Sequence, residues 1–167
     1  MHVVPLRPPR FERLAELAGR YPELDASAVR SCLVLLRVAT DVTATLDAYF
    51  SEFGLSHGRF AVLMMLWRSE GGLSPARIAE QCDVTPPTIT GLCKKLEADG
   101  LVRRRADAAD RRACVVTLTP RARRLLERLL PGHFTRQATM LAALSEAERA
   151  ELVRLLTNIR PAPSHPT

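Results

Sequence analysis

The feature that most constrains this chain is a pair of short helix signals that follow each other almost without a gap. In the segment LSPARIAEQCDV, Ser74 can cap a helix whose first position is Pro75, where a missing amide hydrogen costs nothing. In the segment TPPTITGLCKKLEADG, the hydroxyl of Thr85 is predicted to cap a second helix, which Gly100 helps to end. Two short helices joined by the turn around Asp83 predict a helix-turn-helix.

The second of these helices has two different faces. Its apolar residues recur at three- and four-residue steps, which places Ile89, Leu92, Cys93 and Leu96 in one buried stripe. The opposite face carries small, hydroxylic and cationic side chains, and the positive end of the helix dipole lies at its start. Such a face can approach a phosphate backbone and place donors and acceptors against base edges. Its members are Thr88, Thr90, Gly91, Lys94 and Lys95.

The segment after this helix has the pattern of a β-hairpin. A basic strand, LVRRR, is followed by a turn rich in Asp and Ala and then by ACVVTLT, whose β-branched residues favour a second strand. The turn carries Arg111 and Arg112. A hairpin with arginines at its tip, next to a cationic helix, predicts a DNA-binding wing.

The run from Leu55 to Thr119 resembles the multiple-antibiotic-resistance regulator family, MarR, of winged-helix repressors. The resemblance rests on the leading Leu55–Trp67 helix, on the core TPPTITGLCKKLEADGLVRR, and on a wing tip of Asp110, Arg111 and Arg112 that closes into VVTLT. The departures are local. Arg59 stands where the family often has Gln, and Ala122 stands where Gly is common.

The resemblance and the cationic helix face together indicate which residues contact DNA. We expect the hydroxyls and lysines in or beside the major groove, and Arg112 in the minor groove, oriented by Asp110. The expected DNA-binding residues are Thr85, Pro87, Thr88, Thr90, Lys94, Lys95, Arg105, Asp110, Arg111 and Arg112.

The net charge favours an anionic partner. The 167 residues include 24 Lys and Arg against 18 Asp and Glu, which gives a net charge of +6 and a pI near 9.8. Charge alone fits nucleic acid and an acidic membrane surface equally, so the motif has to decide. Prolines interrupt the first ten residues, and no apolar run approaches the roughly twenty residues of a membrane span. We therefore expect a cytoplasmic protein that binds double-stranded DNA and no membrane.

Both ends of the chain are predicted to be helical. A long helix from Ala26 to Phe53, preceded by a short one at Phe11–Arg20, is apolar on more than one face, so a partner subunit is expected to share its burial. A further helix begins after Thr119 and is expected to bend or break at Pro131-Gly132. A capping box of Ser145 and Glu148 then predicts a last helix.

The predicted fold is mainly α with a small β-wing, a winged helix-turn-helix domain flanked by dimerisation helices. Its expected parts are an N-terminal extension and long dimerisation helix (1–54), the DNA-binding region (55–119), C-terminal dimerisation helices (120–160) and a disordered tail (161–167). The helices predict a homodimer. Since each base contact discriminates by about 1–3 kcal/mol, doubling the contacts on a palindromic operator increases specificity.

A repressor of this kind also needs an input signal. In the family, small aromatic acids often bind between the dimer helices and the winged lobe, so the resemblance implies a phenolic or aromatic acid as effector. The residues expected to contact it are Arg37, Asp41, His57, Arg59, Phe60 and Met64.

Cys32 supports an alternative input. Organic-hydroperoxide sensors of the same family carry a reactive cysteine near the start of the equivalent long helix, which would make this chain a thiol-based sensor. The positions where those sensors have tyrosines are Leu46 and His57 here, so a partner for the thiolate is missing. The cysteines fit no metal-ligand spacing, and small buried positions suit most of them, so neither a metal nor a cofactor is expected.

Two other classes of function, an enzyme and a protein-interaction module, fit the sequence less well than a DNA-binding regulator. The four histidines are scattered, and no nucleophile or phosphate-cradle motif is present, so an enzyme is not expected. A winged helix can also be a protein-interaction module without DNA binding, but such a module has no need for paired arginines at its wing tip. The sequence therefore predicts a DNA-binding transcriptional regulator, a repressor that a small molecule releases from its operator.

Overall fold

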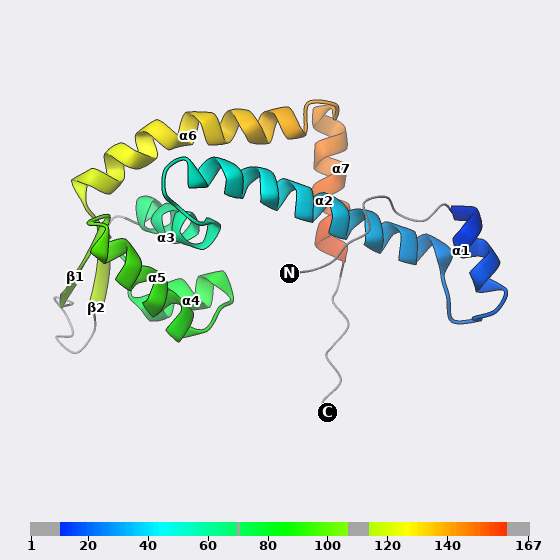
Figure 1. Ribbon diagram of the computed structural model, residues 1–167, viewed down its shortest axis with the longest axis horizontal. Helices are drawn as coiled ribbons and strands as arrows, with labels where there is room; N and C mark the ends of the chain where they lie inside the picture. Colours follow the sequence, from blue (N-terminus) through cyan, green and yellow to red (C-terminus); the bar gives the residue numbers. More distant parts are fainter. Residues whose placement is uncertain (1–10, 70, 107–113, 160–167) are drawn as a thin grey trace. The chain divides into compact units, whose positions relative to one another are not determined.

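The computed structural model of the chain describes residues 11–69, 71–106 and 114–159. It is mostly helical with one small antiparallel sheet, which confirms the predicted fold class (Figure 1). In chain order the elements are α1 (Phe11–Ala18), α2 (Ala26–Ser51), α3 (His57–Arg68), α4 (Pro75–Cys82), α5 (Pro86–Ala98), β1 (Val102–Ala106), β2 (Cys114–Leu118), α6 (Pro120–Met140) and α7 (Glu146–Asn158).

Most helices begin at the polar residues that the sequence marks as caps. The Asp25 carboxylate accepts from the backbone N–H groups of Ser27 and Ala28 at the start of α2, and these bonds hold the pKa of Asp25 below its ordinary value. Ser74 caps α4. The predicted capping box of Ser145 and Glu148 at the start of α7 is confirmed.

The start of α5 differs from the predicted hydroxyl cap. Thr85 occupies the cap position, but its hydroxyl contacts the hydroxyl of Thr88 at 2.9 Å and no backbone amide. Pro86 and Pro87 have no N–H to offer, and the N–H of Thr88 already donates to the carbonyl of Thr85 at 3.0 Å. The prolines therefore remove the donors that a capping hydroxyl would bind.

The hairpin that follows α5 gains a third backbone segment. β1 and β2 pair in antiparallel register from Val102 opposite Leu118 to Ala106 opposite Cys114. Leu73 then pairs with Val116, exchanging backbone hydrogen bonds of 3.1 and 2.9 Å. This pairing joins the chain just before α4 to the hairpin.

We expect Gly72→Ala to destabilise the protein strongly. Gly72 has φ +87°, and an ideal Cβ there would lie 2.4 Å from the carbonyl oxygen of Val116. Backbone strain and the forced displacement of β2 should together cost about 3 kcal/mol of unfolding free energy. Urea denaturation followed by circular dichroism measures this loss.

Gly91→Ala is the matched control for this substitution. Gly91 lies inside α5, and nothing stands within 4 Å of its would-be Cβ. Because alanine is the better helix former, this variant should gain roughly 0.5–1 kcal/mol. Equal effects of the two substitutions would contradict the close approach of β2 at Gly72.

The chain divides into two compact units, Met1–Leu126 and Glu127–Thr167. The core of the first unit surrounds α3, which packs against α2, α5 and β2. The Phe50 ring of α2 stacks on Phe60 of α3 with 4.1 Å between their centroids. The largest fully buried side chains of this unit are Phe50, Val62, Leu63, Leu66, Ile78, Ile89, Cys93, Leu96, Val116 and Leu126.

The expected break at Pro131-Gly132 is wrong, because α6 runs without interruption from Pro120 to Met140, whereas a bend at this proline stays a prediction. A proline inside a helix removes one backbone hydrogen bond, that to the carbonyl of Glu127. Both Pro131 and Glu127 are exposed, so water can solvate that carbonyl. The Thr135 hydroxyl also donates to the Pro131 carbonyl at 3.0 Å.

α7, in the second unit, is a helix with no buried residue. Its apolar side chains are all partly or largely exposed, among them Val153, Leu155 and Leu156, and so is Ile159 just after its end. Within the described residues, none of the helices combines the length and apolar character that spanning a membrane requires.

Candidate nucleic-acid interface

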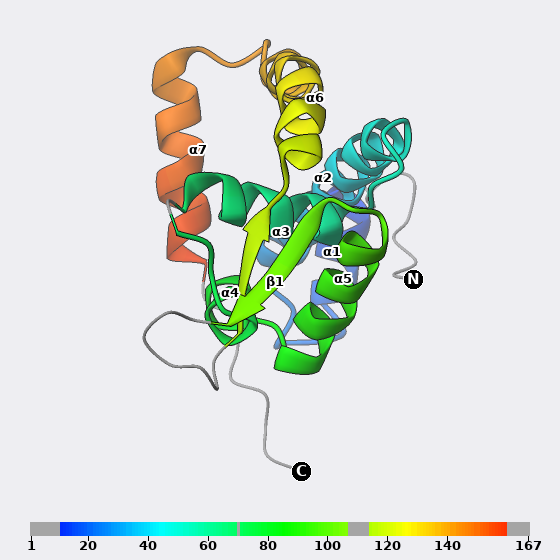
Figure 2. The same ribbon diagram turned by 90° about the vertical axis from the view of Figure 1, so that its left-hand side faces the viewer.

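The helix-turn-helix consists of α4, a tight turn and α5. Asp83 ends α4 in the left-handed conformation, with φ 52° and ψ 46°, a region that Asp and Asn tolerate better than most residues. The N–H of Val84 donates to the carbonyl of Ala79 at 3.1 Å and closes the turn. Figure 2 shows α5 beside the β1–β2 hairpin, with which it packs. The predicted motif is therefore present.

The face of α5 that carries the predicted DNA contacts lies open to solvent. Thr88, Lys94 and Lys95 are exposed, whereas Thr90 is half-buried on the side of the hairpin. Neither lysine has an ion-pair partner among the described residues. Both lysines of α5 are thus available to bind an external anion.

The buried face of α5 follows the predicted stripe. Ile89, Cys93 and Leu96 are fully buried, and Leu92 is half-buried against α3. Burial raises the pKa of the Cys93 thiol above its ordinary value, as expected for a thiol that fills a core position.

Arg104 fastens α5 to the hairpin. Its Nε lies 3.4 Å from Oε2 of Glu97, its backbone N–H donates to Oε1 of Glu97 at 3.3 Å, and its Nη2 donates to the Thr90 carbonyl at 3.4 Å. Arg104 faces the helix and its neighbours in β1 face away from it, because successive residues of a strand point to opposite sides.

The structure describes part of the rest of the wing. Arg103 and Arg105 are exposed, and Nη2 of Arg105 donates to the Gly71 carbonyl at 3.0 Å. The predicted tip residues Asp110, Arg111 and Arg112 lie outside the described residues.

Arg59 holds the far end of α5. Its Nη2 pairs with the carboxylate of Asp99, which follows α5, and its Nη1 donates to the Gly54 carbonyl at 2.9 Å. The guanidinium is largely buried, whereas Asp99 is half-exposed. Arg59 was expected in the effector pocket, and that role stays a prediction; its partners in the structure connect it to the helix-turn-helix.

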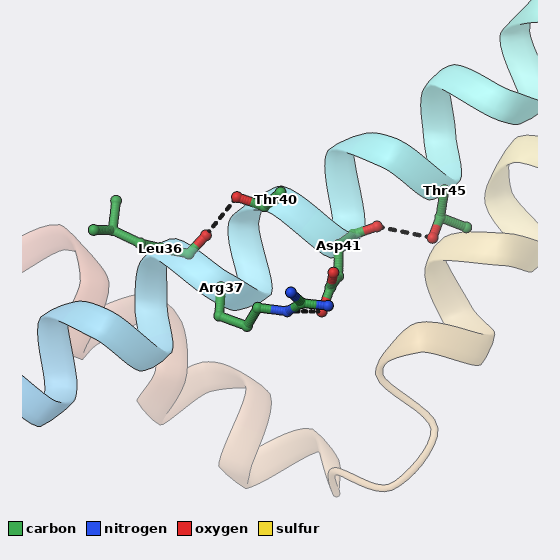
Figure 3. A network of polar contacts seen from close by, with 5 residues as sticks. All are labelled: Leu36, Arg37, Thr40, Asp41 and Thr45. Carbon is green, nitrogen blue, oxygen red and sulfur yellow. Dashed lines mark hydrogen bonds and ion pairs between the residues drawn. The ribbon is translucent and has the colours of Figure 1, made fainter. Parts of the chain in front are cut away.

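The remaining predicted effector residues fall into separate groups within one chain. Arg37 and Asp41 pair with each other at 2.8 Å on α2, where threonine hydroxyls also bond to the helix backbone (Figure 3). Nδ1 of His57 lies 3.6 Å from Asp47. Phe60 is in the core, and Met64 is half-buried. The effector assignment stays a prediction.

Cys32 is exposed on α2, and its role as a peroxide sensor also stays a prediction. The thiol of Cys82 donates to the thioether of Met65 at 3.1 Å. Cys82 and Cys114 are half-buried.

The sequence reasoning missed three contacts that set the geometry of this interface. These are the pairing of Leu73 with Val116, the bonds of Arg104 to α5, and the bonds of Arg59 to Asp99 and Gly54. Only the second had a usable signal, because Arg104 lies between two outward-facing strand positions and Glu97 lies near the end of the preceding helix.

Comparisons with known proteins agree on one family. The profile of the MarR family matches residues 53–113. The HTH-type transcriptional repressor YetL of Bacillus subtilis is 33% identical over 152 residues, which are 90% of this chain and 91% of YetL. Bordetella bronchiseptica BpsR, whose DNA binding is regulated by 6-hydroxynicotinic acid, is 29% identical with a TM-score of 0.68, covering 77% of this chain and 91% of BpsR.

The structure of the S. aureus MepR–DNA complex shows the same fold, with a TM-score of 0.68 at 24% identity over 75% of this chain and 96% of MepR. Members of the family are transcriptional regulators and not enzymes. An identity of 33% across nine tenths of both this chain and YetL, joined to the helix-turn-helix and hairpin described above, establishes the relationship. The chain is therefore a DNA-binding transcriptional regulator of the MarR family.

Proposed function

We propose that this chain acts as a homodimeric repressor that binds a palindromic operator through α5 and the wing and is released by a small aromatic or phenolic acid. The observation that carries the proposal is the exposed face of α5, where Lys94 and Lys95 have no acidic partner among the described residues. A cationic face without internal partners is suited to an anion from outside.

The roles follow from the chemistry of this face. Thr85, Thr88 and Thr90 carry short hydroxyls that can donate to phosphate or base edges, and Pro87 contributes apolar surface next to them. Lys94 and Lys95 neutralise phosphates. Arg105 lies toward the wing, and at the wing tip Arg112, with Arg111 and Asp110, enters the minor groove. Half-sites one helical turn apart, about 34 Å, would match two such faces.

The homodimer is supported by apolar surface that one chain leaves uncovered. Val34, Leu36 and Val38 of α2 are exposed, and so is the apolar side of α7. A soluble protein rarely leaves so many large apolar side chains in water unless a partner covers them. Most soluble oligomers are symmetric homo-oligomers, and two-fold dimers are the commonest of them. A second copy of this chain, related by two-fold symmetry, is therefore the partner that we propose for these exposed apolar residues.

The effector class is supported by the relative BpsR, whose DNA binding responds to an aromatic acid. A carboxylate of this kind pairs well with an arginine, and Arg37 of α2, which pairs with Asp41 in one chain, is one of the proposed contacts. The other proposed contacts are Asp41, His57, Arg59, Phe60 and Met64. A thermal-shift screen with aromatic acids tests the class, since a ligand that binds the folded state raises the melting temperature.

The wing is tested by Arg112→Ala. We expect the affinity for a duplex that the wild-type protein selects from a random pool to fall, and the slope of log K against log salt to decrease by about one unit for each lost contact. Fluorescence anisotropy over a salt series measures both quantities.

Arg20→Ala is the matched control, because Arg20 is exposed, follows α1 directly in the sequence, and is distant in sequence from the helix-turn-helix. Its salt slope should equal that of the wild type. If Arg112→Ala leaves the slope unchanged as well, the wing does not bind phosphate in the proposed manner.

A further inference from the structure

α5 rests on α3 at two levels. Near its middle, Leu92 lies against Gly58, where an ideal Cβ would be 3.4 Å from Leu92 Cδ1. Beyond its last turn, Asp99 pairs with Arg59, the residue next to Gly58. One contact is apolar, whereas the other is an ion pair at the end of the helix.

A small tilt of α5 about Leu92 would move its two ends in opposite directions. Asp99 lies about two helical turns from Leu92, roughly 10 Å along the axis, and Thr88 lies about one turn away on the other side, roughly 6 Å. A shift of about 1 Å at Asp99 would therefore move Thr88 by about 0.6 Å. That displacement is comparable with the whole range of distances over which a hydrogen bond to a base or phosphate is good.

Arg59 is also bonded to the turn between α2 and α3. Its Nη1 donates to the carbonyl of Gly54, the residue that closes α2 with φ +66°. The Nε of Arg59 is buried and has no hydrogen-bond partner among the described residues, so the guanidinium is held by these two contacts alone. Arg59 therefore links the α2–α3 turn to Asp99.

We propose that Arg59 is a positioning residue for DNA recognition, which sets the angle of α5 by joining Asp99 to the Gly54 carbonyl. It touches no DNA itself. The proposal rests on the proposed role of α5 as the DNA reader, and it adds the element that orients this reader and connects it to the long helix α2. Arginine here, in place of a neutral residue, allows the bidentate reach that both partners need.

The test is a double-substitution cycle in the full chain with Arg59→Gln, Asp99→Asn and the two combined. The probes are a short duplex that the wild-type protein selects from a random pool and a scrambled duplex of the same composition. We expect each single variant to bind the selected duplex roughly tenfold more weakly, because base contacts lose their geometry. Binding to the scrambled duplex should change less than about twofold, and the combined variant should be no worse than either single one.

The salt slope separates positioning from contact. Because Arg59 neutralises no phosphate in this proposal, its removal should leave the slope unchanged, whereas loss of a phosphate contact lowers it by about one unit. Arg68→Gln, an exposed arginine at the end of the same helix, is the control for net charge and should bind both duplexes as the wild type does. The charge-reversed pair Arg59→Asp with Asp99→Arg should recover part of the lost specificity.

Three results would overturn the proposal: single variants with wild-type specificity, additive losses in the combined variant, or a reduced salt slope in Arg59→Gln. The proposal would also be overturned if the affinity for both duplexes fell equally and in parallel with the melting temperature of the variants, since that result indicates a loss of stability. Wild-type protein that selects no duplex from the pool would instead defeat the proposed function, and the positioning role with it.

Discussion

Replacing both Lys94 and Lys95 by glutamate is expected to abolish operator binding. In a dimer this removes four positive charges from the two α5 faces and introduces four negative ones beside the phosphate backbone. Loss of several phosphate contacts, with repulsion added, should weaken binding by about a thousandfold or more at physiological salt. The neutral variant Lys94→Gln with Lys95→Gln should lower the salt slope by roughly four units per dimer. Fluorescence anisotropy with the selected duplex measures both effects.

The fold should survive these changes. Both lysines are exposed and lack ion-pair partners in the described part of the chain, and such surface substitutions usually change stability by less than about 0.5 kcal/mol. A variant with Arg20→Glu and Arg30→Glu changes the net charge by the same amount at exposed positions outside the helix-turn-helix. If this control loses affinity as severely, the effect belongs to net charge, and α5 is not the reader.

Features encoded within a few residues were predictable from the sequence. The cap at Ser74, the capping box at Ser145 and the apolar stripe of α5 each depend on neighbours within one or two helical turns, and all agree with the structure. The prediction at Thr85 had the correct position and the wrong bond. A cap rule assumes a free amide, and the two prolines after Thr85 remove it.

Contacts between distant segments were not predictable in the same way. Arg59 and Asp99 are forty positions apart, and nothing local in either segment indicates that α3 and α5 bring them together. The pairing of Leu73 with Val116 likewise appears only when the hairpin has folded against the chain before α4. The continuous α6 shows that a local rule for proline does not by itself predict a break, because the surrounding turns continue the helix.

The candidate site also contains both locally encoded features and contacts between distant segments. The cationic face of α5 depends on helical period alone, so its exposed residues could be named in advance. The proposed effector residues depend on how α2 meets other elements and a second subunit. In one chain Arg37 pairs with Asp41, and His57 lies near Asp47. Periodicity contains no information about such partners.

Replacing Leu155 and Leu156 of α7 by glutamate is expected to convert the dimer into monomers. Neither side chain is buried within one chain, so the substitutions break no internal core contact. In a dimer, burying each leucine side chain would contribute about 1.5 kcal/mol or more of transfer free energy, and the four leucines of the two subunits would together contribute roughly 6 kcal/mol. The dissociation constant should then rise by about four orders of magnitude. Sedimentation at micromolar concentration measures the change, and operator affinity should fall with it.

The control lies on the same helix. Ala150 is exposed near the Glu151–Arg154 ion pair, so Ala150→Glu adds the same kind of charge to the polar side of α7 and should leave the dimer intact. Because an obligate dimer can lose its folded state on dissociation, the wild-type protein supplies an independent test. Its melting temperature should rise with protein concentration, as mass action requires for a dimer. A melting temperature that is independent of concentration, together with unchanged sedimentation of the Leu155→Glu/Leu156→Glu variant, would mean that the apolar side of α7 is not a subunit interface.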